Sequence, residues 1–120
     1  MNIALLVAAG LMTVTVFIHI FMGGPEIMPP VRTATLPRHV RAVMDVIWHG
    51  ITVVLICIAA GLFWLTWHQN PALLWALNAI QIGFAGLFIW YGVRQLRNLY
   101  VMPQWVIFLG VPALSVWGVS

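Results

Sequence analysis

The sequence has very few charged groups. It contains no lysine, and its 120 residues include five arginines, two acidic residues and four histidines. Charged residues make up 6% of the chain, whereas about 25% is usual in soluble domains. Because so few charges cannot cover the surface of a chain that is 63% hydrophobic, a soluble globular enzyme is excluded. The composition instead predicts an integral membrane protein.

Other absences exclude further classes of protein. The single cysteine, Cys57, has no partner for an intrachain disulfide or a CxxC redox pair. Serine occurs only at Ser115 and Ser120, so a Ser-His-Asp hydrolase is not expected. No glycine-rich phosphate loop is present, and the arginines form no basic run of the kind that binds nucleic acid.

Hydrophobic runs separated by turn residues predict a single all-α domain, an antiparallel four-helix transmembrane bundle. The first run is expected to end at Gly23–Pro25, and the proline-rich segment Glu26–Leu36 to form a connection. Pro37 is expected in the first turn of the second helix, Asn70 to cap the third, and Pro112 to kink the fourth. The predicted helices cover about residues 3–22, 37–67, 71–97 and 103–119.

The arginines predict how the chain is oriented. All five lie in two of the predicted connections, Arg32, Arg38 and Arg41 in the first and Arg94 and Arg97 in the third. By the positive-inside rule these two connections are cytoplasmic, and both termini are extracytoplasmic. The sequence therefore predicts a multi-pass protein of an inner membrane.

Both acidic residues and three of the four histidines, His19, His39 and His49, lie in the same half of the predicted bundle. On the second helix, an arc of roughly 80°, at about 100° per residue, contains Arg38, Arg41, Asp45, His49 and Thr52. His19 lies near the end of the first helix, and Glu26 follows it at the membrane edge. This polar cluster comprises His19, Glu26, Arg38, Arg41, Asp45, His49 and Thr52.

Three interpretations of the cluster remain open. In the first, Asp45 pairs with Arg41 or Arg38 and the cluster only fixes helix packing. In the second, His19, His49 and Asp45 or Glu26 bind a transition metal, or the two histidines bind haem axially. In the third, the stripe conducts a proton or a substrate. No HExxH, HxxxH or CxxC spacing selects among them.

The leading functional hypothesis is therefore a non-catalytic membrane protein, either an accessory or assembly subunit or a small binding protein. Its expected partners are the lipid bilayer and either further copies of the chain or another membrane protein. The alternative is a redox protein or a metal- or haem-binding protein that uses His19 and His49 with Asp45 and Glu26. Asn78 and Gln81 on the third helix are expected to form interhelical hydrogen bonds or, in a second reading, to contact a ligand.

Overall fold

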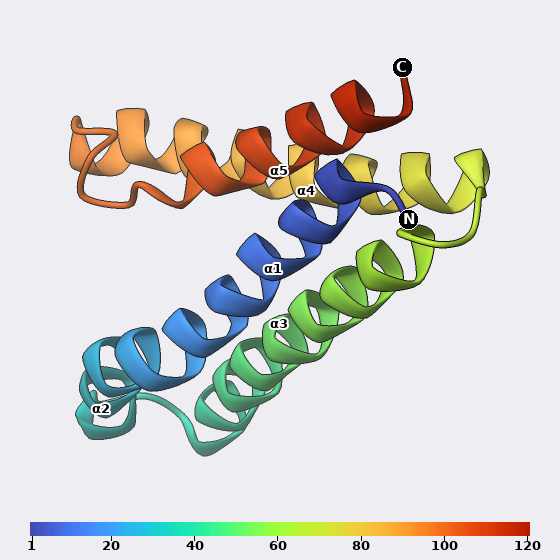
Figure 1. Ribbon diagram of the computed structural model, residues 1–120. Coiled ribbons are helices and arrows are strands. Elements are labelled where there is room, and N and C mark those ends of the chain that lie inside the picture. The colour runs from blue at the N-terminus through green and yellow to red at the C-terminus, as the bar shows by residue number, and fades with distance from the viewer.

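The computed structural model describes residues 1–120 and is all-helical, with 84% helix and no strands (Figure 1). This confirms the predicted all-α class. In chain order the elements are α1 (Ile3–Ile18), the π-helix η1 (His19–Gly23), α2 (Gly24–Thr33), α3 (Arg38–Leu65), α4 (Pro71–Tyr91), the π-helix η2 (Gly92–Leu96) and α5 (Gln104–Val119).

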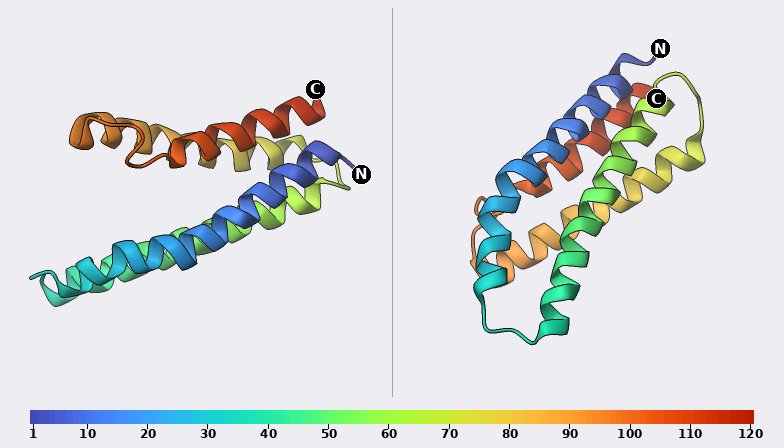
Figure 2. Two further views of the ribbon diagram at one scale, coloured as in Figure 1. Left: turned by 60° about the vertical axis from the view of Figure 1, so that its left-hand side comes forward. Right: turned by 90° about the horizontal axis from the view of Figure 1, so that it is seen from below.

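The helices form two antiparallel pairs. α1 and its continuation α2 lie beside α3, and α4 lies beside α5. The two pairs meet near the chain termini, where α1 packs on α5 and α3 contacts α4. They diverge toward the ends that carry the arginines, so that the molecule is a wedge rather than a closed bundle (Figure 2).

The prediction that the first helix ends at Gly23–Pro25 is wrong, and so is the connection predicted over residues 26–36. Helix continues without interruption from Ile3 to Thr33. Both glycines have right-handed helical dihedral angles, and the turn before Pro25 widens into η1, in which the Gly24 N–H bonds the His19 carbonyl. Pro25 then lies in the first turn of α2, directly after the widened turn, a position at which proline is tolerated. The true connection is the short segment 34–37.

The other helix boundaries differ less from the predicted ones. α3 begins at Arg38, with Pro37 at the capping position rather than inside the first turn. α4 begins at Pro71 as predicted, because the Asn70 side chain accepts a hydrogen bond of 3.0 Å from the Leu73 N–H. α5 is helical on both sides of Pro112, and the kink there stays a prediction.

Apolar side chains from α1, α3, α4 and α5 form one core where the two pairs meet. Met12, Leu55, Ile58, Leu62 and Val111 are among its fully buried members. Many other large apolar side chains face outward, as lipid contact requires. Three helical segments are long and apolar enough to cross a membrane: Ile3–Thr33, Arg38–Leu65 and Pro71–Leu96. These segments indicate a membrane protein, and α5 is a shorter apolar helix.

Candidate functional site

His19 and Trp48 form the contact between η1 and α3. Their rings stack with centroids 4.1 Å apart and planes 19° apart, and His19 Nε2 lies 3.3 Å from the Trp48 carbonyl oxygen. Gly23 gives Trp48 the room that it occupies, because a Cβ at Gly23 would lie 3.2 Å from Trp48 Cη2. The widened turn and the glycine therefore position an aromatic side chain at the polar cluster. Trp48 was not among the candidate residues identified from the sequence, although it is adjacent to His49 in the chain.

The structure does not bring the proposed metal ligands together. The ring of His19 faces Trp48, whereas His49 is exposed on α3. Glu26 is exposed on α2 and, at about 100° per residue, lies roughly 160° around that helix from Met28. No group of three or more His, Cys, Asp or Glu side chains could hold a metal ion.

The ion pair expected between Asp45 and Arg41 or Arg38 does not form. Arg41 Nη2 instead donates a hydrogen bond of 3.1 Å to the carbonyl of Ala34, which caps the C-terminus of α2. This bond turns the guanidinium toward the connection between α2 and α3. As a result, Arg41 Nε and Asp45 Oδ1 are both buried without a hydrogen-bond partner, and Arg38 is exposed.

A shallow groove of about 440 Å³ runs between η1–α2 and α3. Its polar side chains are Arg32, His49 and Thr52, and Gly24 contributes no side chain to it. The Thr52 hydroxyl donates a hydrogen bond of 3.3 Å to the Trp48 carbonyl. The groove is lined by Ile20, Gly24, Pro25, Met28, Pro29, Arg32, Trp48, His49 and Thr52. Arg32 belongs to this site, although the predicted cluster did not include it.

A second polar group lies between α4 and α5. Asn78 Nδ2 donates to Ser115 Oγ at 3.0 Å, and Ser115 Oγ lies 3.1 Å from Asn78 Oδ1 and 2.9 Å from the Pro112 carbonyl. Gln81 forms no interhelical bond: its Nε2 donates to the Leu77 carbonyl of its own helix at 3.3 Å. Gln81 Oε1 is buried without a partner. The sequence indicated the two amides but not Ser115.

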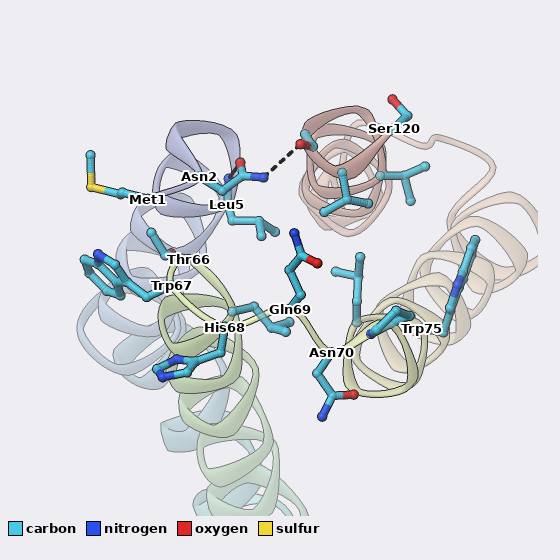
Figure 3. A pocket seen from close by; sticks show the side chains of 16 residues that line it. Met1, Asn2, Leu5, Thr66, Trp67, His68, Gln69, Asn70, Trp75 and Ser120 are labelled. Carbon is cyan, nitrogen blue, oxygen red and sulfur yellow. Dashed lines mark hydrogen bonds between the residues drawn. The ribbon is translucent and has the colours of Figure 1, made fainter.

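A pocket of about 550 Å³ lies at the opposite end of the molecule from the arginines, where the termini meet the α3–α4 turn (Figure 3). Asn2 closes one side of it, because its Nδ2 donates to the Gly118 carbonyl and its backbone N–H donates to the Thr66 carbonyl, each at 2.8 Å. The Gln69 side chain projects into the pocket. No Arg, Asp or Glu side chain lines it. This pocket was not predicted from the sequence.

Comparison of the chain with protein-family models, with curated proteins and with solved structures finds no match. The geometry of these sites is therefore the basis for any statement about function.

Proposed function

We propose that the chain is a four-span integral membrane protein with both termini extracytoplasmic. The antiparallel packing of α5 on α4 supports a fourth span, since it returns the C-terminus to the end where the N-terminus lies. The bond between Asn2 and the Gly118 carbonyl joins those two ends. With 16 residues, α5 is about 24 Å long, so the residues before it complete a crossing of about 30 Å. All five arginines then lie on the cytoplasmic side.

Within this membrane protein, we propose that the half with the arginines is a binding site of a small, non-catalytic binding protein. The observation that carries this proposal is the pair of buried, unpartnered polar atoms on α3, Asp45 Oδ1 and Arg41 Nε. A polar network that served only packing would satisfy both atoms, because unpaired polar groups are costly in a membrane. The exposed His49 and the groove next to it provide access for a ligand.

The metal or haem alternative has less support. This alternative needs His19 and His49 to coordinate the same metal ion together with a carboxylate, or to coordinate the same haem. His19 is instead stacked on Trp48 and exposed His49 is part of the groove. The binding function therefore has the stronger support.

Native mass spectrometry of the full chain, released in detergent from its own membranes, tests the proposed binding site. We expect the wild-type chain to carry a bound mass that His49→Ala loses. His39→Ala is the matched control, because His39 is an exposed histidine in the first turn of α3 that lines neither the groove nor the pocket at the termini and should leave the bound mass unchanged.

The nature of the bound mass also separates the two versions of the leading hypothesis. A small molecule or lipid supports a small binding protein, whereas a second polypeptide lost only in His49→Ala supports an accessory subunit. A chain without any bound mass, or with a mass that His49→Ala retains, would contradict a binding site at this cluster.

A further inference from the structure

The groove between α2 and α3 has a distinct chemical character. Its walls are apolar, formed by Ile20 and Met28 on one side and the Trp48 ring on the other. The prolines at 25 and 29 offer no backbone N–H to a ligand. Specific hydrogen bonds in the groove must therefore come mainly from side chains.

Two of those side chains carry nitrogen donors. Arg32 lies in the last turn of α2, next to the cytoplasmic connection, and His49 lies on the facing side of the groove on α3. Both can donate hydrogen bonds to an anion. The Thr52 hydroxyl hydrogen is already directed to the Trp48 carbonyl, so Thr52 offers mainly its oxygen.

Negative charge is kept away from the groove. The two acidic residues of the chain, Glu26 and Asp45, are both absent from its lining. Glu26 lies on another face of α2, as its position about 160° from Met28 requires. Asp45 Oδ1 is buried on α3, one helical turn from both Arg41 and His49. A ligand in the groove therefore meets the N–H donors of Arg32 and His49 and no carboxylate wall.

We propose that this groove binds an anionic ligand that carries a phosphate group, with Arg32 as the donor to the phosphate and His49 as a further hydrogen-bond donor deeper in the groove. This inference rests on the proposed binding function and names the chemical class of the ligand. Arginine matches phosphate geometry through paired N–H donors, and a site at the membrane edge lets it reach the headgroup level. The apolar walls contact the uncharged remainder of the ligand.

Two sources can supply such a phosphate: the headgroup of an anionic phospholipid and a soluble phosphate ester. The experiment that tests the proposal uses the full chain in detergent and follows its melting temperature. The probes are phosphatidylglycerol, phosphatidylcholine with the same acyl chains, and glycerol 3-phosphate. The variants are Arg32→Gln and His49→Ala, with Arg97→Gln as the matched control because Arg97 is exposed and lies outside the groove.

We expect stabilisation of the wild-type chain by phosphatidylglycerol or by glycerol 3-phosphate, and the effective probe identifies the source. The apparent affinity should fall about tenfold in Arg32→Gln, as expected from the loss of a charge-assisted hydrogen bond. His49→Ala should weaken binding in the same direction, and Arg97→Gln should not.

Three results would overturn the inference: no stabilisation by either phosphate-bearing anion, equal stabilisation by phosphatidylcholine, or equal losses in Arg32→Gln and Arg97→Gln. The last would indicate diffuse attraction to the arginine-bearing end. If a bound mass disappears in His49→Ala while the phosphate test fails, the binding function stands and only the ligand class is wrong. Since both substituted side chains are exposed, the melting temperatures without ligand check that the variants fold.

Discussion

The two polar regions of this molecule differ in whether their polar side chains are paired with each other. Between α4 and α5, Asn78 and Ser115 are 1% and 0% exposed, and each bonds the other. Between α2 and α3, the polar cluster is partly exposed, and Asp45 Oδ1 and Arg41 Nε have no partner. The first region closes upon itself, whereas the second leaves a donor and an acceptor unpaired on α3, the helix that forms one side of the groove.

This difference distinguishes packing from binding. A buried amide in an apolar bundle must be paired within the protein, and its pairing fixes the register of two helices. The Asn78–Ser115 contact does this for α4 and α5. Polar groups that remain unpaired next to a groove can accept a partner from outside, which is the condition for a ligand site.

The largest expected effect concerns the orientation of the chain in the membrane, because the two polar regions are proposed to lie at different depths and toward different sides of the bilayer. A reporter enzyme that is active only outside the cytoplasm should be active when it is fused after Ser120. The same reporter should be inactive when it is fused within the connection 34–37. The physical reason is the excess of arginine at that end. An inactive reporter after Ser120 would mean either that the orientation is the reverse of the proposed one or that α5 does not cross the membrane.

The next largest effect is the loss of the α4–α5 contact. Ser115→Ala leaves the buried Asn78 amide without its side-chain partner, so we expect the free energy of unfolding in detergent to fall by roughly 1–3 kcal/mol. Ser120→Ala is the matched control, because Ser120 is exposed and bonds only the nearby Trp117 carbonyl. Equal stability of the two variants would show that the Asn78–Ser115 pair does not fix α5.

A smaller effect of opposite sign is expected at Gln81, the exception within the paired region. Its Oε1 is buried without a partner, and its Nε2 makes a 3.3 Å bond within α4. Gln81→Leu removes the unpaired oxygen at similar volume and should raise the free energy of unfolding by about 1 kcal/mol. Thermal unfolding in detergent measures the change. A clear loss of stability would mean that a water or another group satisfies this oxygen.

Much of the architecture is readable from local sequence signals. The helical class follows from the hydrophobic runs, and the start of α4 follows from Asn70 and Pro71. The end of the first helix was misread because glycine and proline usually terminate helices. Here a π turn accommodates Pro25, and a single sequence carries no clear signal for such a turn.

The sites were less predictable than the helices, because they depend on which helix faces which. The cluster residues of α3 were recognised from their spacing, whereas Arg32 joins them only through the packing of α2 on α3, and Trp48 through its contacts with His19 and Gly23 of η1. Ser115 was missed for the same reason, since the register between α4 and α5 sets its contact with Asn78. The hydrogen bond from Arg41 to the Ala34 carbonyl was equally unpredictable from the sequence, and this bond takes the place of the expected ion pair.

The smallest expected effect is at Asp45, where sequence and structure lead to opposite predictions. If Asp45 were the counter-charge of Arg41 or Arg38, removing its charge would break a buried pair and cost about 3–5 kcal/mol. In the structure Arg41 is bonded to Ala34 and Asp45 Oδ1 has no hydrogen-bond partner. We therefore expect Asp45→Asn to cause no loss in the free energy of unfolding in detergent, because the substitution breaks no hydrogen bond or ion pair. A loss as large as that of Ser115→Ala would place Asp45 in a closed network and make the two polar regions alike. Stability that is unchanged, together with altered ligand binding, would keep them distinct.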